Sequence, residues 1–367
     1  MRNLLLALIL LLGVYFVITR FTEAQQVALT LQRGNWLWLL AAGLVQLVWM
    51  LNVAASYRAI YRALGVEERI ERLIPLVSAA FFVNLVAPVA GMSGLAVFIA
   101  EARRRGQPVG RVSTASALMV LYDYAAFLLV LTVGLVVLFR RNSLSAAEVI
   151  ASVILVLIAA GLATLLYLGM RSADQLGRVL AGMASLVNRI ARPFIHHDYL
   201  NVARAREFAH DASEGLHEAR RTPGNLLLPG ALALSSKAFL ISILFFVFLA
   251  FRQPFSVGTL IAGFSIGYLF LIVSPTPSGI GFVEGALTLA LTSLRVPLAP
   301  AALISLAYRG ISLWFPFAYS AIAFRWVSRP DPIPKAERLP GPARPGLPGN
   351  SSPTPSSPAN PTTHSKP

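Results

Sequence analysis

The chain has 367 residues, of which 56% are hydrophobic and 13% are charged, and its mean hydropathy is +0.68. Several uncharged runs exceed the roughly 17–25 apolar residues that cross a bilayer, which excludes an ordinary soluble domain. The absence of cysteine excludes disulfides and thiolate metal sites, and the net charge of +15 comes from arginines flanking apolar runs, which indicates membrane topology and not nucleic-acid binding.

Six apolar segments are predicted to span the bilayer as single helices. The first follows Met1-Arg2-Asn3, and because no convincing small-residue cleavage site ends it, we expect a retained helix and not a removed secretory signal. The predicted spans are 3–20, 36–57, 113–139, 149–170, 225–250 and 300–324.

Two further apolar stretches, 74–100 and 255–295, are interrupted by proline and glycine. Proline lacks a backbone donor, and glycine permits unusual dihedral angles. Each stretch is therefore predicted to enter the bilayer and return as a broken, re-entrant hairpin, with its irregular backbone buried in protein or facing a wet cavity. The breaks contain Asn84, Pro88, Gly91 and Gly94 in the first stretch, and Pro275, Pro277, Gly279 and Gly281 in the second.

Clusters of arginine predict the orientation of the chain. One cluster lies between Arg58 and Arg72, and another at Arg103–Arg105, on either side of the stretch 74–100. A hairpin keeps both clusters on the cytoplasmic side, whereas a single crossing, the alternative, would place them on opposite sides. We favour the hairpin and predict a multi-pass protein of the cytoplasmic (inner) membrane with both termini cytoplasmic.

The two interrupted stretches also match in layout. Pro88 precedes Tyr122 by 34 residues, and Pro275 precedes Tyr308 by 33. Opposite entry sides would make the two units an inverted repeat, in which a substrate site lies near the bilayer midplane; chance spacing is the alternative. The predicted fold is thus all-α: a polytopic helical membrane protein with about six full spans plus two Pro/Gly-broken re-entrant hairpins.

Two regions differ from the spans in composition. The segment 171–222 is polar and basic, and it includes an amphipathic helix over 174–192 that is predicted to lie on the anionic inner leaflet; a partner-binding helix is the alternative. Half of the 24 prolines lie from Pro330 onward, a composition that cannot form a core. We therefore predict a membrane domain over 1–328 and a disordered cytoplasmic tail over 329–367.

Four ionisable residues lie inside the apolar segments: Asp123, Lys237, Glu284 and Arg309. An ion near the bilayer centre costs ~2.5–3.5 kcal/mol on insertion scales, so such residues usually face a polar cavity or one another. We interpret them as a translocation site, with the cations neutralising a lipid phosphate and the acids balancing them or exchanging protons. The alternatives are a structural ion pair of Asp123 with Arg309 or Lys237, a helix-dipole partner for Glu284, and a snorkelling Lys237.

Other motifs favour structural interpretations. Gly263 and Gly267 form a small-xxx-small face that favours tight helix packing. His210, Glu214 and His217 share a helical face, but they lie among arginines in a polar segment, so we expect a solvated face and no metal. No P-loop and no catalytic constellation is present. The sequence predicts a protein that is not an enzyme and uses no cofactor.

A family resemblance follows from longer strings of residues. The chain carries Ser274-Pro275-Thr276-Pro277-Ser278-Gly279-Ile280-Gly281-Phe282-Val283-Glu284-Gly285, then Tyr308-Arg309 and Trp314-Phe315-Pro316, and earlier Asn84-Leu85-Val86-Ala87-Pro88 with Gly91 and Gly94. Over about residues 1–328 this resembles the lysylphosphatidylglycerol synthase transmembrane region family of flippase-like integral membrane proteins. Members often carry Glu-Arg with a nearby Asp where this chain has Leu121-Tyr122-Asp123, so only the acidic position carries over.

The resemblance implies lipid translocation without lysyl transfer, since no soluble aminoacyl-transfer domain follows Arg325. We expect a lipid flippase that moves an anionic or glycan-linked lipid between leaflets, with membrane lipids as its partners. The alternative is an accessory membrane scaffold for a lipid- or polysaccharide-modifying enzyme, with an envelope-biosynthesis enzyme or a second copy of the chain as its partner. An intramembrane transferase is a third interpretation, for which no donor site is evident.

Overall fold

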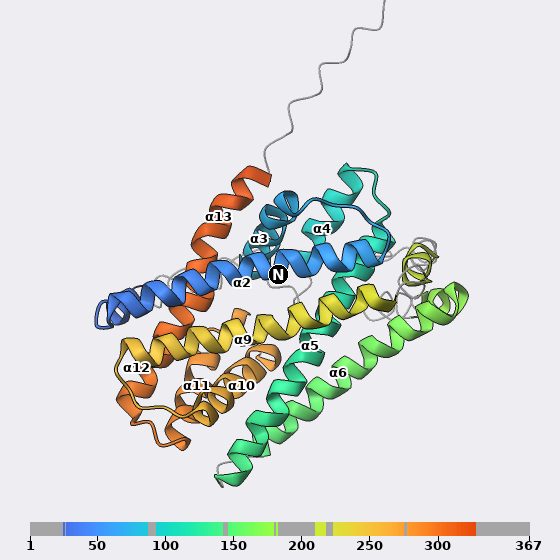
Figure 1. Ribbon diagram of the computed structural model, residues 1–367. Helices are drawn as coiled ribbons and strands as arrows, with labels where there is room; N and C mark the ends of the chain where they lie inside the picture. The colour runs from blue at the N-terminus through green and yellow to red at the C-terminus, as the bar shows by residue number, and fades with distance from the viewer. Residues whose placement is uncertain are drawn as a thin grey trace, which may run out of the picture. The chain divides into compact units, whose positions relative to one another are not determined.

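The structure is a computed structural model that describes residues 25, 27–86, 93–141, 146–179, 181–182, 210–217, 223–274 and 277–327. Within these ranges the chain forms helices and no strand (Figure 1). In the described part of the chain, four single helices are long and apolar enough to cross a membrane, and these are α2 (Trp36–Ala63), α5 (Val109–Arg140), α6 (Ala146–Arg171) and α9 (Leu227–Ala250).

The fifth such segment, Leu298–Ile322, is composite. It consists of α12 (Leu298–Arg309), a π-helix (Gly310–Trp314) and the start of α13 (Phe315–Val327). The prediction of a polytopic all-α membrane protein is therefore confirmed. The first predicted span, 3–20, and the predicted tail, 329–367, lie outside the described residues, as does most of the predicted amphipathic helix 174–192.

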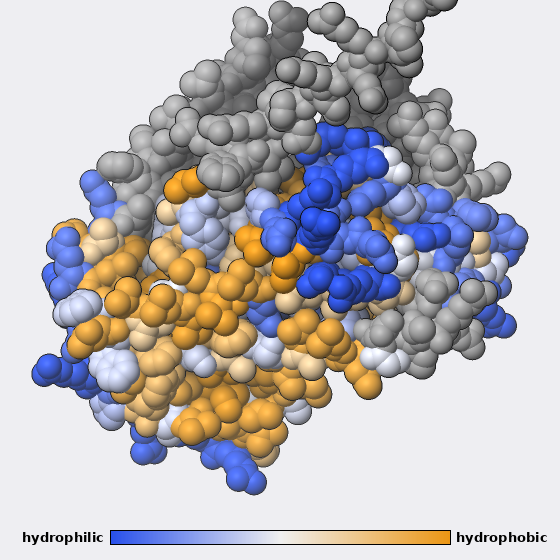
Figure 2. Space-filling model, turned by 45° about the horizontal axis from the view of Figure 1, so that its top comes forward, coloured by the Kyte–Doolittle hydropathy of each residue, from blue (hydrophilic) through white to orange (hydrophobic). Residues whose placement is uncertain are grey.

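Apolar side chains point outward from the long helices, as expected for surfaces that face lipid. On α6, Ile150 and Leu157 are 60% and 66% exposed, and Leu129 on α5 is 63% exposed. Figure 2 shows apolar residues over much of the face drawn, with hydrophilic residues gathered in one patch and at the edge. Helix α2 begins at a polar cap, where the Asn35 side chain accepts a hydrogen bond from the Leu37 amide. The helix at 257–273 begins in the same way, where Ser256 accepts a hydrogen bond from the Thr259 amide.

Helices α2 and α9 lie side by side in the centre of the view (Figure 1). Polar side chains join them: Trp49 Nε1 donates to Ser236 Oγ at 2.8 Å, and Asn52 Nδ2 donates to the Leu232 carbonyl at 2.9 Å. Ser235 Oγ in turn donates to Asn52 Oδ1 at 3.0 Å. Because no water competes within a bilayer, these interhelical hydrogen bonds hold the two helices in register.

The two interrupted stretches form two pairs of packed helices. The first pair is α3 (Ile70–Val86) with α4 (Ser93–Arg104), and the second is α10 (Val257–Val273) with α11 (Phe282–Ser293). Helices α4 and α11 have 12 residues each, or about 18 Å, which is too short to cross a hydrocarbon core of about 30 Å.

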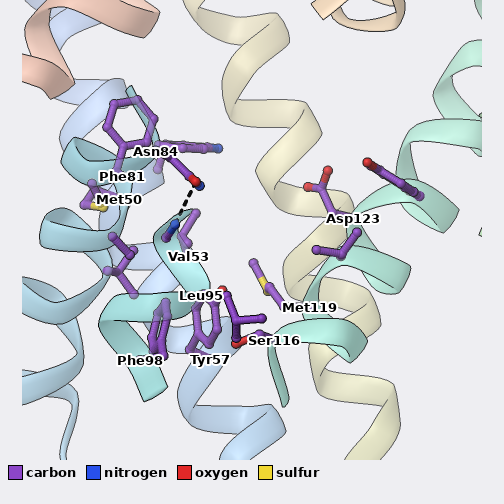
Figure 3. A pocket seen from close by; sticks show the side chains of 16 residues that line it. Met50, Val53, Tyr57, Phe81, Asn84, Leu95, Phe98, Ser116, Met119 and Asp123 are labelled. Atoms are coloured by element: carbon purple, nitrogen blue, oxygen red, sulfur yellow. Dashed lines mark hydrogen bonds between the residues drawn. The ribbon is translucent and has the colours of Figure 1, made fainter. Parts of the chain in front are cut away.

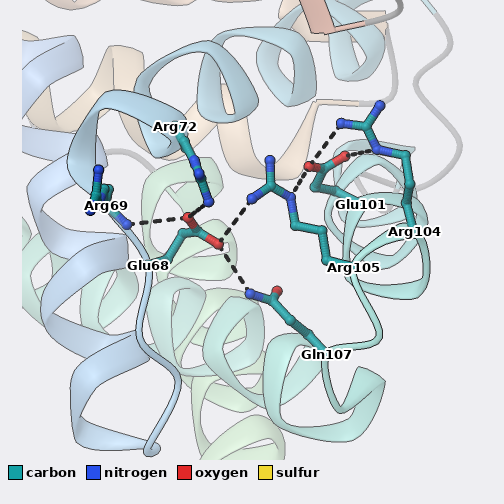
Figure 4. Close-up of polar contacts among 7 residues, drawn as sticks. All are labelled: Glu68, Arg69, Arg72, Glu101, Arg104, Arg105 and Gln107. Atoms are coloured by element: carbon teal, nitrogen blue, oxygen red, sulfur yellow. Dashed lines mark hydrogen bonds and ion pairs between the residues drawn. The ribbon is translucent and has the colours of Figure 1, made fainter. Parts of the chain in front are cut away.

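Polar contacts join the start of α3 to the end of α4, at the end of the first pair opposite its bend (Figure 4). Glu68, just before α3, lies 3.8 Å from Arg105 Nη1, just after α4, and accepts a hydrogen bond from Gln107 at 3.0 Å. Arg105 and Arg104 also pair with Glu101. The chain therefore leaves α4 beside the point where it entered α3, so the basic clusters on both sides of the pair gather at one end.

Arg141, at the far end of α5, joins the start of α10 to the end of α11 in the second pair. Its guanidinium donates to Ser256 Oγ at 3.0 Å, where α10 begins, and to the Leu294 carbonyl at 3.5 Å, where α11 ends. The first pair opens beside the start of α5, and the second opens beside its end. The two pairs are thus inverted with respect to each other, and α3 contacts the 3₁₀ helix η2 (Pro277–Gly279) of the second pair.

The residues predicted to break the stretches divide between two roles. Gly279 and Gly281 have φ values of +72° and +75°, and Ser278 has +57°, so the second bend uses the left-handed region that favours glycine. Pro277 begins η2, while Pro88, Gly91 and Pro275 lie outside the described residues.

Gly94 and Asn84 are placed differently from the prediction, because both lie inside helices. Asn84 Oδ1 accepts a hydrogen bond from the Gly94 amide at 2.8 Å and so caps the start of α4 from α3. A Cβ atom at position 94 would lie 3.0 Å from the Ala80 carbonyl oxygen. Gly94 therefore serves close packing of α3 on α4, and not an unusual dihedral angle.

The small-residue face of α10 serves the same purpose in the second pair. A Cβ atom on Gly263 would lie 2.8 Å from Leu291 of α11, and one on Gly267 would lie 3.5 Å from Leu287. These glycines let α11 approach α10 closely, as the small-xxx-small spacing predicted.

Candidate functional site

The four ionisable residues that the sequence placed in one site form two separate ion pairs. Lys237 on α9 pairs with Asp123 on α5, and Arg309 on α12 pairs with Glu284 on α11. The structural pairing of Asp123 with Lys237 is therefore present, and pairing with Arg309 is not. Each pair joins two helices, so each neutralises charge that would otherwise be costly at this depth.

Lys237 is fully buried and makes three contacts around its ammonium group. Its Nζ atom donates to Asp123 Oδ1 at 2.6 Å and to Tyr268 Oη at 2.7 Å, and it lies 3.9 Å from the centroid of the Tyr268 ring. Tyr268 Oη in turn donates to Asp123 Oδ2 at 2.8 Å. The three side chains thus close a triangle between α9, α5 and α10, and Lys237 does not snorkel to the surface.

Arg309 holds the irregular backbone of the second bend. Its Nε atom donates to Glu284 Oε1 at 2.6 Å, and its Nη2 atom donates to the Ser278 carbonyl at 2.7 Å. Glu284 lies in the first turn of α11, where a carboxylate also suits the positive end of the helix dipole. Ser305 Oγ donates to the Glu284 carbonyl at 2.9 Å. Together these bonds supply a partner to carbonyl and carboxylate groups that have no water to bind.

A π-helix follows Arg309 directly, over Gly310–Trp314. Such single π turns occur often at functional sites, because the extra residue changes the direction in which neighbouring side chains point. Here it separates Arg309, which faces the second bend, from α13, which packs on α3. The composite segment therefore links the second pair of helices to the first.

A cavity of about 270 Å³ lies between α2, α3, α4 and α5 (Figure 3). Asn84 of the first pair and Asp123 of α5 lie on opposite sides of it. Its lining is mainly apolar and aromatic, with a few polar groups, and of the described lining residues Asp123 alone carries a formal charge. Of the four predicted site residues, Asp123 lines this cavity, and Lys237, Glu284 and Arg309 do not.

The cavity reflects a difference between the two halves. Asp123 follows Tyr122 on α5, after the first pair, and Arg309 follows Tyr308 on α12, after the second pair. In the second half the long Arg309 side chain reaches the bend of its own pair. In the first half the short Asp123 side chain turns to Tyr268 of the other pair, and a cavity separates it from Asn84 and Gly94.

Tyr268 is the residue of this site that the sequence analysis did not single out. Its phenol links Asp123 of α5 to α10 of the second pair of helices. A tyrosine inside an apolar stretch carries a hydroxyl that needs a partner in a membrane, which was the available signal. The ring also packs on Phe127 of α5, with centroids 4.7 Å apart.

The histidine segment shows no metal site among the residues that the structure describes. Glu214 pairs with Arg111 at 2.9 Å, and His217 Nδ1 lies 2.7 Å from the Ser213 carbonyl oxygen. The Arg111 guanidinium lowers the pKa of the exposed Glu214 carboxyl. Glu214 thus ties segment 210–217 to the start of α5.

Comparison with known proteins gives one result. The family model described as "Lysylphosphatidylglycerol synthase TM region" matches residues 4–320, which is most of the chain and all of the helices that form the two ion pairs and the cavity. No curated protein and no solved structure matches the chain.

Proposed function

The chain belongs to the lysylphosphatidylglycerol synthase TM region family, and from that premise we propose that it is a lipid flippase that moves an anionic or glycan-linked lipid between the leaflets of the cytoplasmic membrane. The observation that carries the proposal is the cavity bordered by Asp123, whose charge is neutralised by Lys237 from behind. A cavity with a polar wall, bordered by the span-length helices α2 and α5, offers a polar headgroup a path that the hydrocarbon core does not.

The inverted arrangement of the two helix pairs supports movement between leaflets. The first pair opens beside the start of α5 and the second beside its end, and α3 contacts the bend of the second pair. In carriers built this way, small movements of one half against the other expose a central site alternately to each side. In this proposal both pairs are re-entrant hairpins, and the headgroup passes where they meet.

Each buried charge has a role in this scheme. Lys237 and Asp123 keep the empty site neutral, and Tyr268 holds both in place. Arg309 and Glu284 keep the second bend folded, and Arg309 attracts a phosphate when that bend moves. Proton exchange by Asp123 or Glu284 balances the charge of the lipid. The protein acts as a transporter and not as an enzyme, with membrane lipids as its partners and both termini in the cytoplasm.

Leaflet exchange in liposomes tests the proposal. Vesicles carrying a fluorescent lipid are treated with a membrane-impermeant quencher, and the protected fraction measures the lipid that stays inside. We expect wild-type protein to reduce this fraction for at least one lipid of a panel of anionic phospholipids and glycolipids. The Arg309→Ala variant should slow the exchange at least tenfold, because the second bend loses the donor to Ser278.

The matched control is Leu129→Ala, on the lipid-facing side of α5, which should exchange lipid at the wild-type rate. Wild-type vesicles that behave like protein-free vesicles for every lipid of the panel would overturn the proposal. So would an Arg309→Ala variant, correctly folded by size-exclusion chromatography, that exchanges lipid as fast as the wild type.

A further inference from the structure

The cavity between α2, α3, α4 and α5 has a lining that suits neither a phosphate nor an ammonium group. A phosphate there would face the Asp123 carboxylate, the one formally charged group among the described lining residues. The nearest cation of the site, Lys237, is fully buried behind that carboxylate, with its Nζ atom 2.6 Å from Asp123 Oδ1. An anion in the cavity is therefore repelled by the nearer charge and reaches the farther one poorly.

A cationic group meets the opposite difficulty. Asp123 is already neutralised by Lys237, so a second cation beside the carboxylate lies close to the ammonium group. The pair as a whole carries no net charge, which removes the attraction that an aromatic cage with a free carboxylate would offer. The cavity thus favours a ligand that is polar but uncharged.

The carboxylate keeps hydrogen-bonding capacity on the side of the cavity. A carboxylate accepts about four hydrogen bonds, and in the described part of the chain Asp123 accepts from Lys237 and Tyr268. The Asp123 side chain is 23% exposed, and it lines the cavity. A donor from a ligand, such as a hydroxyl, would complete its set without adding charge, and hydrogen bonds to an ionised acceptor are among the stronger ones.

Aromatic rings make up part of the remaining walls, beside aliphatic side chains. Trp49, Tyr57, Phe81, Phe98 and Tyr124 line the cavity, and Tyr57 stacks on Phe98 with ring centroids 4.6 Å apart. Flat aromatic faces pack well against the C–H face of a sugar ring, while hydroxyls at the ring edge need acceptors. At about 270 Å³, the space is below the 300–1,000 Å³ usual for drug-sized ligands, so it fits one small ring or a glycerol unit and not a whole lipid.

We propose that this cavity binds an uncharged, hydroxylated headgroup of a lipid, such as a single sugar ring, with Asp123 as the hydrogen-bond acceptor and the aromatic walls as the stacking surface. The inference rests on the proposed function, and it narrows the substrate to the glycan-linked class. It also assigns Lys237 and Tyr268 as positioning residues that hold Asp123 in place without reaching the ligand.

Equilibrium binding tests this inference separately from transport. Wild-type protein in nanodiscs is titrated with radiolabelled butyl glucoside, and butyl phosphate and butyl trimethylammonium compete for the site. We expect the glucoside to bind at least tenfold more tightly than either charged probe. Methyl glucoside serves as a free-sugar mimic, and it should bind more weakly, because a lipid source contributes its alkyl chain.

Two variants assign the binding to the cavity. Asp123→Asn combined with Lys237→Met removes both charges together, so the fold keeps no unpaired ion, and we expect at least a tenfold loss of glucoside affinity. Phe81→Leu should lower the affinity severalfold by removing a stacking face. The Leu129→Ala control should bind as the wild type does, and thermal unfolding checks that each variant is folded.

The outcomes separate the two proposals. Equal or tighter binding of the phosphate or ammonium probe, no binding of any probe, or full glucoside affinity in the folded double variant would each overturn the inference. Leaflet exchange of phospholipids by the same preparation would leave the flippase proposal standing in those cases. Selective glucoside binding without exchange of any lipid would support the headgroup site and contradict the flippase.

Discussion

Lys237 Nζ on α9 and Asp123 Oδ1 on α5 lie 2.6 Å apart, and Tyr268 of α10 bonds to both. The ion pair and Tyr268 therefore join three helices, α9, α5 and α10. Helix α5 follows the first pair of helices, and α10 belongs to the second. The ion pair is shared between the halves of the molecule, and its removal should affect both.

The first prediction concerns the stability of this ion pair. Asp123→Asn leaves the fully buried Lys237 without its counter-ion, and breaking a buried pair on one side costs about 3–5 kcal/mol. The double variant Asp123→Asn/Lys237→Met should be much closer to wild type, because no unpaired ion remains. Unfolding in detergent of the wild type, Asp123→Asn, Lys237→Met and the double variant gives the double-mutant cycle. Additive effects of the two single substitutions on the free energy of unfolding would contradict the coupling.

The second prediction concerns the second bend. Arg309→Ala removes the donors to Ser278 and Glu284, so the backbone around Gly279 should open more often. The chain has no cysteine, so Phe282→Cys, at the exposed start of α11, reports on this opening without background labelling. We expect Phe282→Cys to react with a soluble maleimide at least severalfold faster in the Arg309→Ala background. Arg309→Lys should resemble Arg309→Ala, since an ammonium group does not reproduce the guanidinium fork.

The third prediction concerns sidedness, and it separates a hairpin from a single crossing. Arg69→Cys precedes α3 and Arg103→Cys lies near the end of α4, and both positions are exposed. The hairpin predicts that both react with an impermeant reagent from the same side of oriented vesicles. Val257→Cys and Leu298→Cys, which flank the second pair, should both react from the other side. Opposite labelling of positions 69 and 103 would show that α3 and α4 cross the bilayer once.

The fourth prediction compares two helical glycines. At Gly94 a Cβ atom would lie 2.7 Å from the Asn84 side chain and 3.0 Å from a backbone oxygen, so Gly94→Ala should destabilise by about 1–3 kcal/mol. At Gly43 of α2 a Cβ atom meets nothing within 4 Å, so Gly43→Ala should be neutral or stabilising by up to about 1 kcal/mol. Equal melting temperatures for the two variants would contradict the packing role of Gly94.

Sequence patterns predicted the helices well because the signals are local. Apolar runs of span length predicted α2, α5, α6, α9 and the composite segment from Leu298, and Pro277, Gly279 and Gly281 located the bend of the second helix pair. The role of Gly279 and Gly281 was also predicted correctly, because both adopt positive φ values, which favour glycine. The similar spacing from proline to tyrosine, 34 and 33 residues, matched Asp123 after the first pair with Arg309 after the second.

The partners of the charged residues were not readable in the same way. Whether Asp123 pairs with Lys237 or Arg309 depends on how α5 is rotated about its axis, and a helix of uniform hydrophobicity does not encode that rotation. The role of Gly94 was predicted incorrectly in kind, because a packing glycine and a bend glycine look alike in sequence. The cavity is formed by side chains of four consecutive helices, and its lining depends on how these helices pack, which no local pattern could predict.

The attachment of α5 differs along its two sides, and this has a mechanical consequence. Toward the second pair, α5 is fastened by Arg141 at its end, by the packing of Phe127 on Tyr268 in its middle, and by the bond of Asp123 to Tyr268. Toward Asn84 of the first pair it faces an empty space. The stiffness of the helix bundle is therefore uneven around α5. Helices α5 and α10 should deform together, and bending strain should concentrate at the cavity between α5 and the first pair.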